Sequence, residues 1–120
     1  MNNDARNNRI DYIEFPVSSA EALAQTKRFY GKVFGWEYKD WGPAYADTHN
    51  SGVTSGIAVD EVDRQHRPLA VIFSKDLENS RAGVVAAGAT LTKDIFAFPG
   101  GRRFQFRDPA GNELAVWSDQ

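Results

Sequence analysis

The sequence predicts an α+β protein built from two βαβββ modules with a mixed or antiparallel sheet, and three observations lead to this prediction. An apolar strand runs into a capped helix twice, each helix ends near a glycine, and each is followed by several short strand segments. Val17 precedes the first helix as Ser74 precedes the second, so the two occurrences are offset by about 57 residues. A doubly wound sheet would instead alternate strand and helix regularly.

The length of 120 residues is expected to form one domain. Residues 1–9 are polar and lack the apolar segment of a signal peptide, so we expect a disordered lead-in there. Residues 10–120 then form the single domain, with module one at about 10–60 and module two at about 68–118. The polar stretch 61–67 is the expected crossover between the modules.

Module one begins with a strand at residues 10–17, which are rich in β-branched and aromatic side chains. Ser18 and Glu21 fit a capping box, which predicts that the first helix starts at Ser18 and runs to a C-cap at Gly35. The helix is expected to bury one broad apolar face, which comprises Ala22, Leu23, Phe29, Tyr30, Val33 and Phe34. Strands are predicted near residues 36–40, 44–48 and 53–59.

Module two repeats this pattern from a short apolar strand at residues 69–74. Asp76 is the expected N-cap of the second helix, whose inner face would carry Leu77, Val84 and Ala87 before Gly88 ends it. Further strand segments are predicted at residues 89–92 and 96–98. A hairpin closes the chain, with strands at 103–107 and 114–117 around the turn formers of Asp-Pro-Ala-Gly-Asn.

Composition excludes several classes of protein. The net charge is −2, and Lys and Arg are scattered among Asp and Glu, so we do not expect a nucleic-acid partner. The chain has no cysteine, which removes disulfides, thiolate zinc sites and cysteine nucleophiles. No apolar run reaches the roughly 18 residues of a membrane span, so we expect a cytoplasmic protein without a membrane partner.

The segments IEFPV, RFYGKVFGWEY and FRDPAGNELAVW together resemble the vicinal oxygen chelate superfamily, which includes glyoxalase I, extradiol dioxygenases and bleomycin-resistance proteins. The resemblance covers about residues 10–118. It implies a glyoxalase-like fold, in which two βαβββ modules form a curved mixed sheet around a cleft, commonly in a homodimer. It also implies that catalytic members hold a divalent metal in the cleft through His, Glu or Gln.

The positions that the resemblance assigns to metal ligands hold unsuitable residues. They are Tyr12 on the first strand, Leu69 at the equivalent place in module two, and Ala115 after the hairpin turn. The fourth position, on the last strand of module one, is left unassigned, and residues 56–59 on that strand offer no ligand. A protonated phenol, an alkyl chain and a methyl group do not attract a divalent cation, so we expect no metal and no other cofactor.

Side chains alternate along a strand, so the residues two apart from these positions should share the face that lines the cleft. The predicted ligand-binding residues are Tyr12, Glu14, Leu69, Val71, Phe73, Glu113, Ala115 and Trp117. No catalytic residue is assigned apart from Glu14, which is a candidate base if burial raises its pKa; it could equally pair with an arginine or lie at a wet edge. Tyr45 is an open candidate, while His49 and His66 are expected to be exposed loop residues.

Three functions stay open on this basis. The first is a metal-independent protein that binds a small aromatic or amphipathic organic molecule. The second is a lyase, isomerase or dioxygenase of the superfamily, either metal-dependent or using Glu14 as its base. The third is a non-catalytic assembly subunit. Exposed sheet edges favour a homodimer in each case.

Overall fold

The computed structural model describes residues 4–60 and 67–120. The described chain forms two compact units, one made of residues from 12 to 69 and one made of residues 4–11 together with 70–120. The predicted crossover lies mostly outside the described residues, and so does His66. Within the described residues, no helix is long and apolar enough to cross a membrane.

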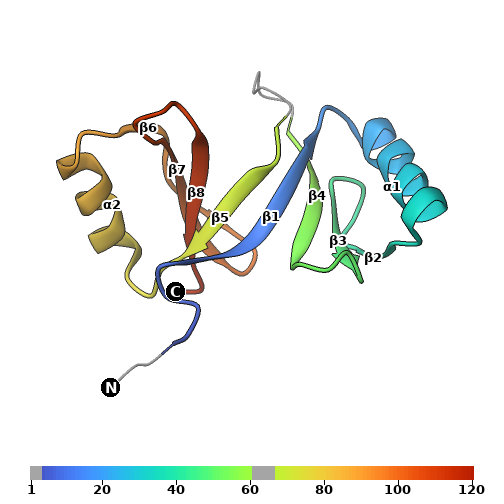
Figure 1. Ribbon diagram of the computed structural model, residues 1–120, viewed down its shortest axis with the longest axis horizontal. Coiled ribbons are helices and arrows are strands. Elements are labelled where there is room, and N and C mark those ends of the chain that lie inside the picture. The colour runs from blue at the N-terminus through green and yellow to red at the C-terminus, as the bar shows by residue number, and fades with distance from the viewer. Residues whose placement is uncertain (1–3, 61–66) are drawn as a thin grey trace. The chain divides into compact units, whose positions relative to one another are not determined.

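Module one contains five elements: β1 (Arg9–Val17), α1 (Ala20–Phe34), β2 (Glu37–Asp40), β3 (Tyr45–His49) and β4 (Ser55–Val59). Its strands lie in the order β2-β3-β4-β1. β1 and β4 are parallel, whereas β3 is antiparallel to both β2 and β4. Figure 1 shows α1 beside this group of strands. The parallel pair requires a crossover, which α1 begins and the short strands complete.

Module two has the same succession: β5 (Leu69–Phe73), α2 (Leu77–Ala86), β6 (Thr90–Phe98), β7 (Gly101–Arg107) and β8 (Glu113–Ser118). The strand order is β5-β8-β7-β6, again with one parallel pair, β5 and β8, and two antiparallel pairs. The two strand segments predicted at 89–92 and 96–98 are one strand, β6, whose pairing with β7 is irregular between Leu91 and Phe96. The α+β class and the two βαβββ modules are confirmed.

The first helix is capped by Ser19, so the prediction of Ser18 as its cap is wrong. Ser19 has extended backbone angles, and its hydroxyl accepts a hydrogen bond from the N–H of Ala22 at 3.0 Å. The helix therefore begins one residue later than the capping box suggests. At the other end, Gly35 adopts φ 75° and its N–H bonds to the carbonyl of Gly31, which confirms the predicted C-cap.

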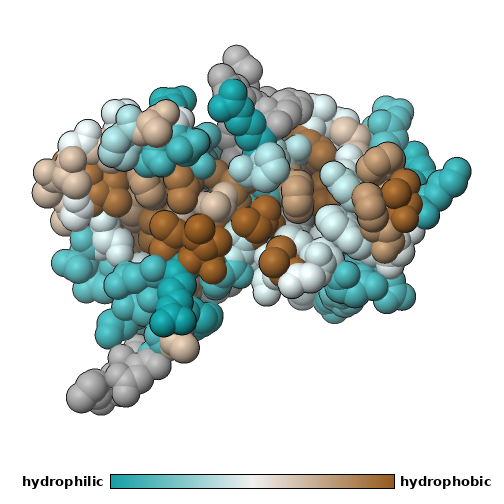
Figure 2. Space-filling view, viewed as in Figure 1, coloured by the Kyte–Doolittle hydropathy of each residue, from teal (hydrophilic) through white to brown (hydrophobic). Residues whose placement is uncertain are grey.

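α1 buries less of its apolar face than the sequence predicts. Leu23 packs in the core of module one with Val17, Ala46 and Ile57. Phe29, Val33 and Phe34 are each more than half exposed. The reason lies in Trp36, whose ring stacks on Tyr30 at 4.5 Å and also contacts Phe15 on β1. Trp36 thus packs between Tyr30 of the helix and Phe15 of β1. Figure 2 shows apolar surface where α1 lies.

The core of module two lies between α2 and one face of its sheet. Leu77, Phe104 and Val116 are buried there, and the partly buried side chains around them are Ile72, Val84, Leu91, Ile95 and Phe106. Leu77 and Val84 are on the inner face of α2 as predicted, but Ala87 is exposed because it is already the C-cap of the helix. Gly88 follows with φ 93° and ends the helical path.

The closing hairpin has the turn that its sequence predicts. Asp108 Oδ1 accepts hydrogen bonds from the backbone N–H groups of Ala110 and Asn112, both at 2.9 Å, and its Oδ2 accepts one from the Asn112 side chain. The bond from the Asn112 side chain, together with the backbone bonds, holds the pKa of Asp108 below its usual value. Gly111 adopts φ 90°, a conformation that glycine reaches without a Cβ clash.

Candidate functional site

The sheet face of module one that points away from α1 carries the first group of candidate residues. Phe15 and Val17 pack in the core beneath α1, so Tyr12 and Glu14 project from the opposite face of β1. The strand registers extend this face sideways, because Glu14 is paired with Gly56 on β4 and Gly56 with Asp47 on β3. Tyr45 lies two residues before Asp47 and therefore shares its side of β3.

These side chains form a hydrogen-bonded group that we call the phenol cluster: Tyr12, Trp41, Tyr45 and Asp47. The hydroxyls of Tyr12 and Tyr45 are hydrogen-bonded to each other. Tyr12 also donates to Asp47 Oδ1 at 3.2 Å, and the indole N–H of Trp41 donates to Asp47 Oδ2 at 2.8 Å. Both oxygens of the Asp47 carboxylate thus accept hydrogen bonds, which orients Tyr12 and Trp41, while Tyr45 is bonded to Tyr12.

Gly56 makes room for the phenol cluster. A methyl group placed on its Cα would overlap the Tyr12 hydroxyl and would lie 2.6 Å from the Tyr45 hydroxyl. Any residue with a side chain would therefore compete with the two hydroxyls for the same space. Tyr45 was an open candidate, and the sequence favoured a core or interface position for Trp41. Asp47 was not predicted, although alternation along residues 45–49 places it on the same side as Tyr45.

Glu14 is buried, with 6% of its surface exposed. Burial excludes the wet-edge position considered for it. Its backbone is paired with Gly56, over which the hydroxyls of the phenol cluster lie. A carboxylate and two phenols are therefore close together on one face of module one. His49, at the end of β3, is exposed.

Module two presents a corresponding face away from α2. Because Ile72 and Val116 contact the core beneath α2, the alternate residues Val71, Phe73, Ala115 and Trp117 point to the other side. Val71 is paired with Ala115 and Phe73 with Trp117. Val71, Phe73 and Ala115 are buried, as is Leu69 at the start of β5, so fewer of the predicted ligand-binding residues reach solvent than the sequence suggests.

Glu113 is a polar residue of this face, and its carboxylate is hydrogen-bonded to two neighbouring side chains. Its Oε2 accepts hydrogen bonds from Thr92 Oγ1 at 2.7 Å and from Gln105 Nε2 at 3.1 Å. Arg103 Nη2 donates in turn to Gln105 Oε1 at 3.0 Å. The sequence analysis missed Thr92 and Gln105; alternation along β7 from Arg103 would have identified Gln105, which is paired with Ala115.

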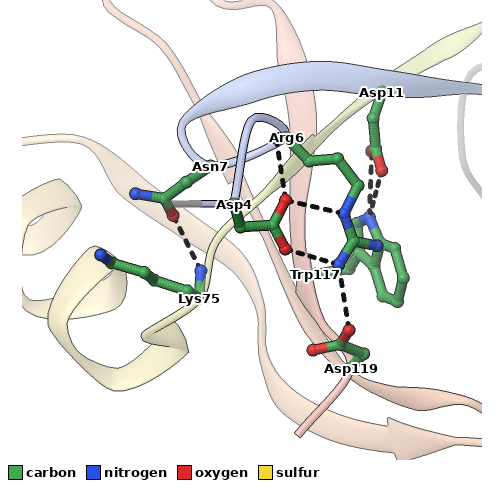
Figure 3. A network of polar contacts seen from close by, with 7 residues as sticks. All are labelled: Asp4, Arg6, Asn7, Asp11, Lys75, Trp117 and Asp119. Carbon is green, nitrogen blue, oxygen red and sulfur yellow. Dashed lines mark hydrogen bonds and ion pairs between the residues drawn. The ribbon is translucent and has the colours of Figure 1, made fainter. Parts of the chain in front are cut away.

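The N-terminal segment, residues 4–11, contacts both Trp117 and Phe73, and Figure 3 shows Arg6 and Asp11 beside Trp117. The indole N–H of Trp117 donates to Asp11 at 3.0 Å. The guanidinium carbon of Arg6 lies 3.8 Å from the centre of the Phe73 ring. Residues 4–9 fall in the predicted disordered lead-in but make defined contacts, because Arg6 pairs with Asp4 within the segment, with Asp119 near the C-terminus and with the Phe73 ring.

The residues present do not fit the divalent metal that the fold family implies. Val71 is paired with Ala115 in module two as Glu14 is with Gly56 in module one, so Gly56 corresponds in register to Ala115. The four positions hold a phenol at Tyr12, no side chain at Gly56, and apolar groups at Leu69 and Ala115. In addition, no three His, Asp or Glu residues gather into a metal-binding group anywhere in residues 4–60 and 67–120.

A parallel strand pair extended by two antiparallel strands and covered by one helix, occurring twice in a chain, defines the glyoxalase-like class of the vicinal oxygen chelate superfamily. Residues 16–117 match the family described as "Glyoxalase-like domain", and the chain belongs to that family. No curated protein matches the sequence significantly.

The solved structures that share this fold are described as different kinds of protein. A superfamily member from Vibrio splendidus is 16% identical, with TM-score 0.64 over 89% of this chain and 96% of that one. An NAD-dependent benzaldehyde dehydrogenase from Legionella pneumophila is 12% identical, with TM-score 0.69 over 89% and 96%. A Mn(II)-bound glyoxalase from Novosphingobium aromaticivorans is 23% identical, with TM-score 0.63 over 95% of this chain but 40% of that one. At these identities the likeness shows the fold alone.

Proposed function

We propose that this protein binds a small aromatic or amphipathic organic molecule, without a metal, on the sheet faces that point away from its helices. The observation that carries the proposal is the phenol cluster above Gly56. At a position where the fold family implies a metal ligand, this chain has two hydroxyls that are bonded to each other, one of which also donates to Asp47. Such an arrangement suits hydrogen bonding to an organic ligand better than coordination of a cation.

The chemistry of the two faces defines the class of ligand. Tyr12, Tyr45 and Trp41 offer aromatic surface together with polar atoms, as sites for flat organic ligands commonly do. Asp47, Glu14 and Glu113 add carboxylates to the same faces. Carboxylates repel anions, so we expect ligands that are neutral or cationic and that donate a hydrogen bond.

The proposal is tested with the aromatic probes 2-naphthol and 7-hydroxycoumarin. Tyr12→Phe removes the hydroxyl that bonds both Tyr45 and Asp47, and we expect it to weaken probe binding by about tenfold, as the loss of one hydrogen bond to a charged group would. Binding is measured by isothermal titration calorimetry. Tyr38→Phe is the matched control, because the Tyr38 hydroxyl donates to the Lys27 carbonyl of α1 and lies on the core side of the sheet.

Two results would overturn the proposal. One is equal affinity of the wild type, Tyr12→Phe and Tyr38→Phe for both probes, or no binding by any of them. The other is a stoichiometric divalent ion in the purified protein, detected by elemental analysis, whose removal by a chelator also removes probe binding.

A second candidate function is proton transfer with Glu14 as the base. It is favoured by the position of Glu14 beside Gly56, over which the two phenol hydroxyls lie. In a carbonyl substrate, the Glu14 carboxylate would take a proton from the carbon next to the carbonyl. The electron pair would move to the carbonyl oxygen, which the Tyr12 hydroxyl would stabilise by a hydrogen bond in place of the one it donates to Asp47.

NMR in D₂O distinguishes this second candidate from binding alone. The wild type would exchange the methyl hydrogens of 4-hydroxyacetophenone faster than the uncatalysed reaction, and Glu14→Gln would abolish exchange while only weakening binding. Exchange at the same rate in both proteins would exclude Glu14 as the base.

We also propose a homodimer. Phe29, Val33 and Phe34 expose apolar surface on α1, which a second copy of the chain would cover. Light scattering over a range of concentrations tests this, and a monomer throughout would contradict it.

A further inference from the structure

We propose that module two contains a second binding site, specific for small organic cations of the guanidinium or alkylammonium class, and that Arg6 occupies it as an internal ligand. The site consists of Phe73, Trp117 and Asp119, which we call the cation cage. It lies in the unit that does not contain the phenol cluster, so it does not depend on the function proposed above.

The aromatic walls of the cation cage come from two paired strands. Phe73 on β5 and Trp117 on β8 are partners in the parallel register, and their rings meet edge to face with centres 5.1 Å apart. The guanidinium carbon of Arg6 lies 3.8 Å from the centre of the Phe73 ring and 5.9 Å from that of Trp117. Both distances are within the range in which a cation is attracted by an aromatic face.

Carboxylates complete the cation cage and hold its walls in place. Arg6 Nη2 donates to Asp119 Oδ2 at 3.1 Å, so the cage itself supplies a negative charge. The Trp117 indole N–H donates to Asp11, at 3.0 Å to Oδ1 and 3.3 Å to Oδ2, which fixes the orientation of the indole ring. In Figure 3 the Arg6 guanidinium lies between these groups. Aromatic faces with a nearby carboxylate are suited to weakly hydrated organic cations.

The segment that places Arg6 in the cage is attached to module two through hydrogen bonds at Asn7 and Asn8. The Asn8 N–H donates to the Phe73 carbonyl at 2.8 Å, and the Lys75 N–H donates to Asn7 Oδ1 at 2.9 Å. The remaining polar contacts of Arg6 are with Asp4 of the same segment, whose pKa they lower to about 2. Those contacts lie within the segment, so Asp119 and the two rings are the groups of the cage that contact the Arg6 guanidinium.

The Arg6 side chain is itself accessible from solvent. Phe73 is 1% exposed, whereas the Arg6 side chain is 43% exposed. The guanidinium thus lies against a buried ring at the end of a partly exposed side chain. A free cation competes with Arg6 for this position, and its apparent affinity is reduced by the fraction of molecules in which Arg6 occupies the cage. The N-terminal segment therefore acts as a built-in competitor.

The test is the binding of methylguanidinium chloride at low millimolar concentration to Arg6→Ala, followed through the indole N–H resonance of Trp117. We expect saturable binding that is at least tenfold tighter in Arg6→Ala than in the wild type. Arg6→Gln serves as a second variant that keeps most of the side-chain length. Methylurea, which is similar in shape but uncharged, should not shift the resonance.

Arg102→Ala is the matched control. Arg102 also donates to a carboxylate, that of Glu78 at 3.0 Å, and to the backbone carbonyl of Gln120. Its removal should leave methylguanidinium binding as in the wild type. Equal affinity of the wild type, Arg6→Ala, Arg6→Gln and Arg102→Ala, or an equal shift by methylurea, would overturn the cation cage. Neither result affects the probe binding expected at the phenol cluster, so the two proposals fail separately.

Discussion

Gly101→Ala is expected to lower the free energy of unfolding by about 3 kcal/mol or more, and the melting temperature by roughly 10 °C. Gly101 begins β7, and an added methyl group would overlap the backbone carbonyl oxygen of Ser118 and lie 3.0 Å from its carbonyl carbon. The obstacle is main chain in a paired strand rather than the end of a flexible side chain. Relief of the overlap would therefore separate β7 from β8. Urea unfolding followed by circular dichroism measures the effect.

Gly83→Ala is the matched control for this substitution. Gly83 lies inside α2, and a methyl group there would meet no atom within 4 Å. Alanine is favoured over glycine in a helix interior, so this variant should be more stable than the wild type by about 0.5–1 kcal/mol. Similar unfolding midpoints for the two variants would contradict the close approach of β7 and β8 at Gly101.

Gly56→Ala is expected to weaken the binding of 2-naphthol by more than tenfold while the protein stays folded. The added methyl group would displace the hydroxyls of Tyr12 and Tyr45, and with them the bond from Tyr12 to Asp47. Unlike the carbonyl at Gly101, these atoms are at the ends of side chains that are only partly buried, so they can move. We expect a stability loss of about 1–3 kcal/mol.

Calorimetric titration and urea unfolding of the same preparation separate the two effects of Gly56→Ala. Gly83→Ala again serves as the control, because it changes a glycine far from the phenol cluster in sequence and in the other unit. Unchanged affinity for 2-naphthol in folded Gly56→Ala would show that the hydroxyls above Gly56 do not bind the probe.

Local features of the sequence predicted most of the secondary structure. Strand composition identified β1 and β5, and the turn formers around Gly111 identified the closing hairpin, because the chemistry of each lies within a few neighbouring residues. The errors also have local causes. Ser18 and Ser19 are both competent caps, and only the backbone path at the helix start selects Ser19. The last turn of α1 is exposed because Trp36 stacks on Tyr30. Trp36 lies beyond the helix, so the spacing of apolar residues within the helix does not predict this contact.

For the candidate site too, some features follow from the sequence and others only from the tertiary structure. The sequence by itself determined which residues occupy three of the family's metal-ligand positions. Tyr12, Leu69 and Ala115 are found by counting along the chain from a nearby strand end or turn. Only the tertiary structure decided what occupies those faces. Tyr12 and Tyr45 are 33 positions apart and Arg6 and Asp119 are 113 apart. Such contacts depend on strand pairing and register, which no local pattern of side chains encodes.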